Sequence, residues 1–277
     1  MRRYSDEEVV ASNFSLIQCR PEGLYRGAQH RNDSIQDGYG LVSLPVYVIN
    51  LDRDVERLIN IRASLQQLGI PFTRFPAFLG TDIPDRWTSD FGRDNPMGAG
   101  QIGCYASHLQ VIANILETDE TARVILEDDC ELSADFAEFL ADIPEQLPED
   151  WDIVRLSPSL KNLKRPVRRI ATLREGRGLY IYSRPPSNAV GYIINRRFAE
   201  HFTKPVERRV SLDAHFRYLT LFGDLTCYGV YPPPVRQRAS IPSSIDRVGR
   251  KTVSIRHRPP VGSVPDRRGF ALRDGRA

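Results

Sequence analysis

Short apolar segments that suit buried strands alternate with amphipathic segments that suit helices through the middle of this chain. The run 46–50 (VYVIN) is apolar enough for a strand buried on both faces. A helix follows to Leu68, where Gly69 occupies the position past its end and Pro71 prevents continuation. A short strand around 72–75 completes a β-α-β unit. We therefore expect an α/β fold with a mainly parallel sheet flanked by helices.

The same alternation continues as far as residue 230. The pattern predicts a helix over 105–116, a strand over 124–126 and then a helix that Ser133 caps. Further strands are predicted at 153–156, 189–194 and 225–230, and further helices at 196–202 and 212–222. The segment 98–103 superficially matches a dinucleotide-binding glycine pattern, but it follows Pro96 rather than a buried strand. We expect a loop there.

The 277 residues suit one large domain with an extension at each end. We expect an irregular N-terminal extension over 1–44, a folded domain over 45–245, and a basic tail rich in Pro and Arg over 246–277. No stretch approaches the roughly 18 apolar residues that span a bilayer. The N-terminus turns acidic where a signal peptide needs an apolar core, so we expect a soluble cytoplasmic protein.

The cysteines give no sign of a structural metal or redox motif. Four are present, Cys19, Cys104, Cys130 and Cys227, and none forms a C-x-x-C pair. This spacing argues against a zinc ribbon and a thioredoxin-type site. We expect thiols in a reducing compartment and a packing role for Cys104.

The net charge of +3 conceals three strongly charged segments. Residues 117–152 hold 14 acids and one base, residues 155–184 nine bases and one acid, and residues 236–277 eleven bases and three acids. Each segment has two interpretations, because charged runs are commonly solvated surface. The functional interpretation places an acidic metal site beside basic surfaces that meet phosphates or an anionic membrane.

Three adjacent carboxylates, Glu127, Asp128 and Asp129, follow the predicted strand at 124–126. Carboxylates suit Mg²⁺ or Mn²⁺, and ligands of open α/β sheets bind beyond the carboxyl ends of strands. Strand alternation predicts that Glu127 and Asp129 point to one side and Asp128 to the other. The alternative is that these acids favour the start of the next helix, an effect of only ~0.3–1 kcal/mol that does not need three acids.

Five segments together resemble a known enzyme family. They are VYVINLDRDVER (46–57), GQIGCYASH (100–108), VILEDDCEL (124–132), NAVGYIIN (188–195) and SLDAHF (211–216). In this order and spacing the chain resembles glycosyltransferase family 25, of the lipooligosaccharide β-galactosyltransferase type, over about residues 45–245. The resemblance implies a GT-A-like, Rossmann-like fold and metal-dependent inverting transfer of a hexose. The donor would be a nucleotide sugar, usually UDP-galactose, and the acceptor a glycan or lipid-linked saccharide of a bacterial surface.

The resemblance also implies roles for individual residues. Those implied to contact the donor are Asn50, Arg53, Arg57, Gly103, Ser107, His108 and Asn188. Glu127, Asp128 and Asp129 would hold Mn²⁺ or Mg²⁺, and Asp213 is our candidate for the general base. His108 would lie at the start of a helix whose N-terminal end favours anions. The family's Gly-Thr is replaced near Asn188, which leaves the donor sugar open.

Two other functions remain compatible with these residues. A metal-dependent nucleotidyltransferase would use the same acids but release pyrophosphate from a triphosphate. A non-catalytic module would keep the fold and bind glycan or membrane. Basic residues of the tail could attach the protein to an anionic membrane at its inner face. We expect no nucleic-acid partner, because the basic segments carry no recognised binding motif.

Overall fold

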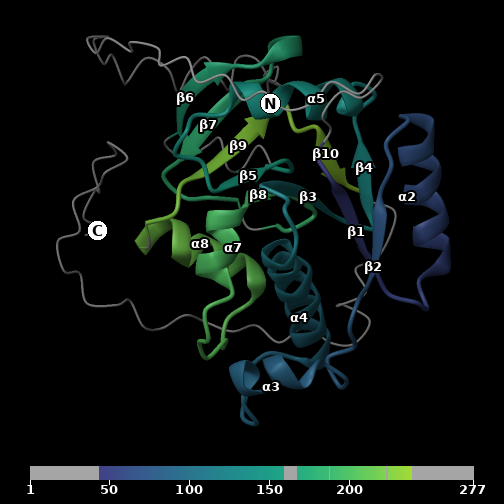
Figure 1. Ribbon diagram of the computed structural model, residues 1–277, viewed down its shortest axis with the longest axis vertical. Coiled ribbons are helices and arrows are strands. Elements are labelled where there is room, and N and C mark those ends of the chain that lie inside the picture. The colour runs from purple at the N-terminus through teal and green to yellow at the C-terminus, as the bar shows by residue number, and fades with distance from the viewer. Residues whose placement is uncertain (1–43, 159–166, 187, 223, 239–277) are drawn as a thin grey trace, which may run out of the picture. The chain divides into compact units, whose positions relative to one another are not determined.

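An eight-stranded sheet with helices on both faces forms the body of the protein (Figure 1). The computed structural model describes residues 44–158, 167–186, 188–222 and 224–238. Of the predicted N-terminal extension only Leu44 falls within these ranges, and the predicted tail at 246–277 lies outside them.

The strands run in the order β2-β1-β3-β8-β5-β9-β7-β6, and a separate two-stranded sheet pairs β4 with β10. Their bounds are β1 Val46–Asn50, β2 Thr73–Pro76, β3 Ala122–Glu127, β4 Cys130–Leu132, β5 Ile153–Arg155, β6 Val167–Thr172, β7 Gly178–Tyr182, β8 Gly191–Asn195, β9 Cys227–Tyr231 and β10 Val235–Gln237. Every strand expected from the sequence is present, whereas β4, β6, β7 and β10 were not expected.

The sheet is mixed, with more antiparallel pairing than the sequence suggested. β1 pairs in parallel with β2 and β3, and β5 with β9, but β8 lies antiparallel between β3 and β5. β7 is antiparallel to both β6 and β9. Strand direction was not readable, because β8 is buried on both faces and its apolar run is the same whichever way it points.

Helices cover the two faces of the sheet. Their bounds are α2 Val55–Gln67, α3 Asp85–Phe91, α4 Ala99–Ala113, α5 Phe136–Gln146, α7 Arg196–Phe202 and α8 Leu212–Phe222, with short 3₁₀ turns at Asn114–Glu117 and Arg174–Gly176. α7 and α8 have the predicted bounds. α2 ends as predicted, with Gly69 in the left-handed region at φ 66°. None of the helices within the described ranges is long and apolar enough to cross a bilayer.

Two helix starts differ from the sequence expectation. α4 begins at Ala99, so the glycine-containing segment expected to be a loop forms its first turns. The Gln101 side chain accepts a hydrogen bond from the Gly98 amide at 3.0 Å, which satisfies a donor that the helix start leaves unpaired. α5 begins after Asp135 rather than Ser133, and the Asp135 carboxylate binds Arg177 instead of capping the helix.

Alternate residues of the central strands divide between two cores. Val48 and Leu126 pack with α2 and α5 on one face, and Ile49 and Ile125 pack with α4, α7 and α8 on the other (Figure 1). This double burial explains why the strands read as continuous apolar runs. The α/β class expected for a GT-A-like fold is confirmed.

Candidate functional site

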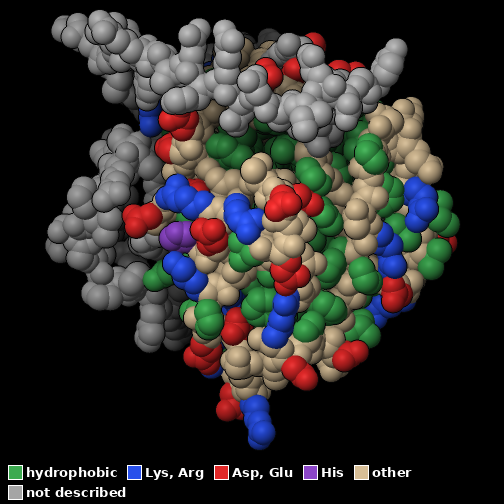
Figure 2. Space-filling view, viewed as in Figure 1, with side chains coloured by type: hydrophobic (Ala, Val, Ile, Leu, Met, Phe, Trp, Pro, Cys, Tyr) green, Lys and Arg blue, Asp and Glu red, His purple; other side chains and the backbone are tan. Residues whose placement is uncertain are grey.

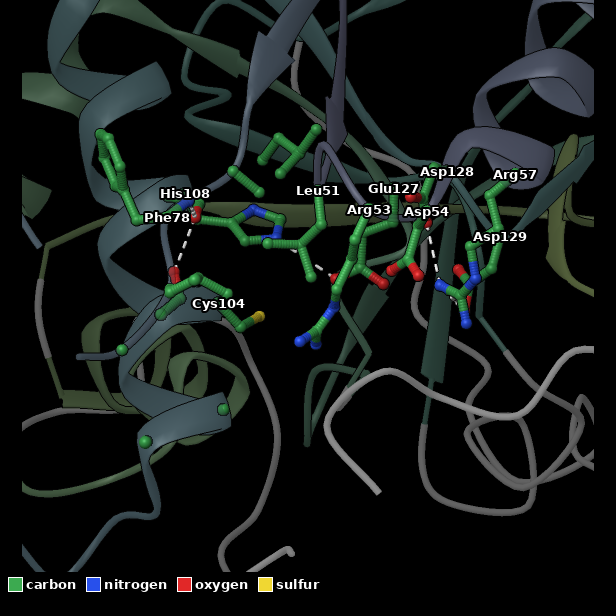
Figure 3. Close-up of a pocket in the computed structure, with 18 of the residues that line it drawn as sticks. Leu51, Arg53, Asp54, Arg57, Phe78, Cys104, His108, Glu127, Asp128 and Asp129 are labelled. Carbon is green, nitrogen blue, oxygen red and sulfur yellow. Dashed lines mark hydrogen bonds and ion pairs between the residues drawn. The ribbon is translucent and has the colours of Figure 1, made fainter. Parts of the chain in front are cut away.

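A cavity of about 270 Å³ lies at the carboxyl ends of β1 and β3, with α4 along one side (Figure 3). The residues that line it are Ile49, Leu51, Arg53, Asp54, Arg57, Ala77, Phe78, Leu79, Gly80, Thr81, Ala99, Gly100, Gly103, Cys104, Ser107, His108, Glu127, Asp128 and Asp129. Most of the predicted site residues are among them. The three exceptions are Asn50, Asn188 and Asp213.

Parallel pairing of β1 with β3 brings Asn50 next to the acidic turn. Its side-chain amide donates to Asp128 Oδ2 at 2.7 Å and to the Asp54 carbonyl at 3.1 Å. Its Oδ1 accepts from Arg74 Nε at 2.9 Å, and only 1% of the residue is exposed. Asn50 therefore orients Asp128 within the protein instead of presenting a polar atom to the cavity.

The two arginines of the first motif differ in environment. Arg57, on α2, is buried and donates to Asp128 Oδ1 at 3.0 Å, while its Nη1 lies 3.9 Å from Asp129 Oδ2. Arg53, just before α2, is exposed and makes no hydrogen bond or ion pair with any residue that the structure describes. Figure 3 shows Arg53 between the α4 residues and the acidic turn. Arg53 is thus the cavity guanidinium best placed to bind an anion.

All three acids line the cavity, so the predicted alternation of their side chains is wrong. β3 ends at Glu127, and Asp128 and Asp129 form a turn before β4. The period of two applies only within a strand. Gln237 of β10 donates to Asp129 Oδ2 at 3.1 Å, whereas the buried Asp129 Oδ1 has no hydrogen-bond donor in the described part of the chain.

The acidic turn concentrates negative charge in a poorly solvated place. Burial, reinforced by the charges of Asp129 and Asp128, raises the pKa of Glu127 well above its usual range. Burial also raises the pKa of Asp128, although hydrogen bonds from Asn50 and Arg57 oppose the shift. A divalent cation would offset this repulsion. The donorless Asp129 Oδ1 and the cavity-facing Glu127 carboxylate fit the oxygen ligands that Mg²⁺ and Mn²⁺ prefer.

His108 lies in the interior of α4, so the prediction that it sits at a helix start is wrong. Its Nδ1 is 2.7 Å from the Tyr192 hydroxyl, and its Nε2 is 3.2 Å from Glu127 Oε1. Burial lowers the pKa of His108 to about 3, which keeps the imidazole neutral at physiological pH. His108 therefore faces the acidic turn as a neutral ring with a fixed orientation.

Gly103 and Ser107 hold the cavity wall together. A Cβ at Gly103 would lie 2.6 Å from both the Gly80 amide nitrogen and the Phe78 carbonyl oxygen, so the close approach of this loop requires glycine. Ser107 Oγ accepts from the Phe78 amide at 2.8 Å and donates to the Gly103 carbonyl at 2.6 Å. Both residues attach the 78–80 loop to α4, and the Ser107 hydroxyl is already engaged.

Asp213 and Asn188 lie outside the lining. Asp213 is half-buried in the first turn of α8, and its charge interacts with Glu127 and His108. Burial raises the pKa of Asp213 to about 6, against the opposing charge of Arg155. Asn188 donates to the Ser157 carbonyl at 2.7 Å, beyond the end of β5. The structure does not bring Asn188 to the cavity.

Two residues near the site were not recognised from the sequence. Arg155 of β5 is 1% exposed and packs over the rings of Phe216 (5.2 Å) and Tyr192 (5.6 Å). Its Nε and Nη2 have no hydrogen-bond partner in the described ranges, and its charge interacts with Glu127 and Asp213. An arginine inside an apolar strand was the available signal. Cys104, for which a packing role was expected, is half-buried and lines the cavity.

Comparisons with a family profile and with curated proteins show which family the chain resembles. The profile described as "Glycosyltransferase family 25 (LPS biosynthesis protein)" matches residues 43–215. A glycosyltransferase 25 family member of Anopheles gambiae is 30% identical over 95 residues, which are 30% of this chain and 16% of that protein. Procollagen galactosyltransferase 1-A of Xenopus laevis is 22% identical over 184 residues, 61% of this chain and 30% of that protein. The chain thus matches less than a third of each relative's length.

Two solved structures show weak similarity. The first is a glycosyltransferase involved in the glycosylation of the major capsid of PBCV-1, with 8% identity and a TM-score of 0.35 over 74% of this chain and 96% of that one. The second is a putative glucose-1-phosphate thymidylyltransferase from Bacillus anthracis, with 12% identity and a TM-score of 0.32 over 66% of each chain. The family match is of a different order, since it covers more than half of the chain and contains every residue that lines the cavity. The chain belongs to glycosyltransferase family 25.

Proposed function

We propose that this protein transfers a hexose, galactose, from a UDP-linked donor to a saccharide or glycolipid acceptor, with inversion and with the help of Mn²⁺ or Mg²⁺. The observation that carries the proposal is that one cavity presents both the exposed guanidinium of Arg53 and the buried oxygen of Asp129 that has no hydrogen-bond donor. A cation and a guanidinium group each neutralise charge on a diphosphate, so a cavity that offers both suits a nucleotide-sugar donor. Family membership and the galactosyltransferase name of the frog relative support galactose.

The residues around the cavity divide the work of such a reaction. Glu127 and Asp129 would hold the cation, which neutralises charge on the departing nucleoside diphosphate. Arg53 would bind a phosphate oxygen through charge-assisted hydrogen bonds. Asn50 and Arg57 hold Asp128 in place, and this fixes the turn on which the neighbouring Asp129 lies. Asp213, ionised at neutral pH, would accept the proton of the acceptor hydroxyl.

A panel of nucleotide sugars, assayed with and without Mn²⁺ for release of diphosphate, tests this proposal. UDP-galactose with a saccharide acceptor should give UDP only when the ion is present. A nucleotidyltransferase would instead release pyrophosphate from a nucleoside triphosphate, and a binding module would release neither. Either of those two results would replace the proposed reaction.

We also propose that the protein acts in the cytoplasm, at the inner face of the membrane, on an acceptor of a bacterial surface polysaccharide. The description of the family as LPS biosynthesis proteins supports this setting. Eleven basic residues in 236–277 would supply the attraction to anionic lipid. Deleting the residues after Ser244 should weaken binding to anionic liposomes, and unaltered binding would exclude the tail.

A further inference from the structure

A second set of ligand atoms lies beside the acidic turn. Cys104, His108 and Glu127 each offer one ligand atom within 4.8 Å of the other two, a cluster found among the described residues. Cys104 and His108 are four residues apart on α4, so both side chains lie on one face of the helix. Glu127 reaches the same point from the end of β3 (Figure 3). We propose that these three residues form a zinc site in the wall of the cavity.

The donor atoms indicate which metal this site would take. A thiolate and an imidazole are softer ligands than the oxygens that Mg²⁺ and Mn²⁺ prefer, and they favour Zn²⁺. Three protein ligands with one open position are typical of zinc sites that exchange a ligand. All three residues line the cavity, which leaves its interior for the fourth ligand.

The spacing of the atoms already approaches that of a tetrahedral site. His108 Nε2 and Glu127 Oε1 are 3.2 Å apart. Zinc bonds of about 2.0–2.3 Å place neighbouring ligand atoms about 3.3–3.6 Å apart. The sulfur of Cys104 lies within 4.8 Å of both atoms, so a small shift of this half-buried side chain at the border of the cavity would complete the site.

The surroundings fix the imidazole for this role. The Tyr192 hydroxyl lies 2.7 Å from His108 Nδ1, and the two rings stack with their centroids 5.8 Å apart. A partner at Nδ1 determines which nitrogen faces the metal, as is usual for zinc-binding histidines. Nε2 is therefore the nitrogen that faces Glu127 and Cys104.

Glu127 belongs both to this cluster and to the proposed manganese pair with Asp129. Zn²⁺ and Mn²⁺ would thus compete for one carboxylate. Zinc binding at this site needs no nucleotide sugar and no transfer reaction. A failure of the zinc site and a failure of the proposed transferase activity are therefore separate results.

Co²⁺, which replaces Zn²⁺ and absorbs when a thiolate binds it, gives the test. Titrating the full chain with Co²⁺ alone should produce a thiolate-to-cobalt band that saturates at one ion per chain and disappears on adding Zn²⁺. Cys104→Ala should remove the band, whereas Cys227→Ala, which removes a buried thiol of β9, should keep it. Tyr192→Phe should weaken binding by about tenfold, because it removes the group that orients His108.

Three results would overturn the proposal. These are no band in the wild type, a band that persists in Cys104→Ala, and a band that Asp129→Asn abolishes, since the last would make Asp129 a required ligand in place of the three proposed ones. A second experiment uses only the wild-type protein, so it tests the site even if a variant does not fold. Zn²⁺ should protect Cys104 from alkylation by iodoacetamide, mapped by mass spectrometry, and equal alkylation with and without Zn²⁺ would contradict the site.

Discussion

Asp129 carries the clearest residue-level signature of a cation site, a buried carboxylate oxygen without a hydrogen-bond donor. Asp129→Asn removes half of the charge that Glu127 and Asp129 would offer an ion, while Gln237 still has an oxygen to bind. We expect loss of Mn²⁺-dependent transfer with unchanged circular dichroism. Asp119→Asn, an exposed acid of the same charged segment, should leave turnover as in the wild type. Undiminished turnover in Asp129→Asn would remove the acidic pair from the mechanism.

Replacing the two arginines of the first motif should affect different properties, donor binding for Arg53 and stability for Arg57. Arg53→Ala deletes an exposed guanidinium, so KM for the donor should rise while the free energy of unfolding stays within about 0.5 kcal/mol. Arg57→Ala leaves the buried Asp128 without its charged partner and should destabilise the fold by about 3–5 kcal/mol. Urea titrations and donor kinetics on both variants make the comparison. Equal effects on KM and stability in the two variants would show that the assigned difference in environment is wrong.

Asp213 should give the activity an acidic limb. Burial raises the pKa of Asp213 to about 6, so the carboxylate that would accept a proton is lost as the pH falls through 6. Below that value kcat should fall about tenfold for each pH unit. The raised pKa of Asp213 also makes the stability of the fold depend on pH. The unfolded carboxyl ionises near pH 3.8, so this group makes the fold less stable as the pH rises from about 4 through 6.

Asp213→Asn separates these two effects. The amide cannot accept the proton, so turnover should be lost at every pH. The difference in unfolding free energy between wild type and variant should move in favour of the variant between pH 4 and pH 7. Chemical denaturation at both pH values measures it. A pH-independent difference would mean that Asp213 titrates normally.

At the scale of elements, the contact between α4 and the 78–80 loop shapes one wall of the cavity. Gly103→Ala would place a Cβ 2.6 Å from two backbone atoms of that loop, and backbone yields less readily than a flexible side chain. We expect a loss of about 1–3 kcal/mol in unfolding free energy, together with weaker donor binding. Gln66→Ala, on the exposed side of α2, controls for a helix substitution that touches no loop. A Gly103→Ala protein as stable as the wild type would show that the loop moves away without cost.

The elements also show where the sequence was informative. β1, α2, α7 and α8 were predictable because each has its own periodicity and clear end signals, such as Gly69. The start of α4 was not, because Gly98 and Gly100 suggest a loop. The contact that requires glycine at position 103 is with the 78–80 loop, which is distant in sequence. β4 and β10 have three residues each and form only by pairing with one another, a long-range contact that no local pattern reveals.

The site follows the same division. The acids of the turn were predictable as a group, since three carboxylates after a buried strand are unusual. The orientation of each side chain was not predictable, because it depends on partners distant in sequence, namely Asn50, Arg57 and Gln237. The place of Arg155 beside the site was not predictable either, because it depends on the rings and acids that surround the buried guanidinium.

At the scale of the whole described unit, the charged segments of the sequence do not become single charged faces. Figure 2 shows both signs of charge interspersed on the face in view. Three of the 14 acids of residues 117–152 line the cavity, and Arg155 and Arg177 of the following basic segment are buried. Arg177 pairs with Asp135 of the acidic segment. Some charged residues of both segments therefore form ion pairs or line the cavity instead of forming a charged surface.

The predicted domain boundary can be tested by truncation. All buried residues of both hydrophobic cores in the described part of the chain lie between Val46 and Val235. A chain that begins at Leu44 should therefore unfold cooperatively with the midpoint of the full chain, measured by thermal denaturation. A chain that begins at Leu51 lacks β1, which pairs with both β2 and β3. It would expose the edge of β3 and remove Val48 and Ile49 from the two cores, so it should not fold. Cooperative unfolding of this shorter chain would contradict the central place of β1, and a much lower midpoint for the longer one would move the boundary into residues 1–43.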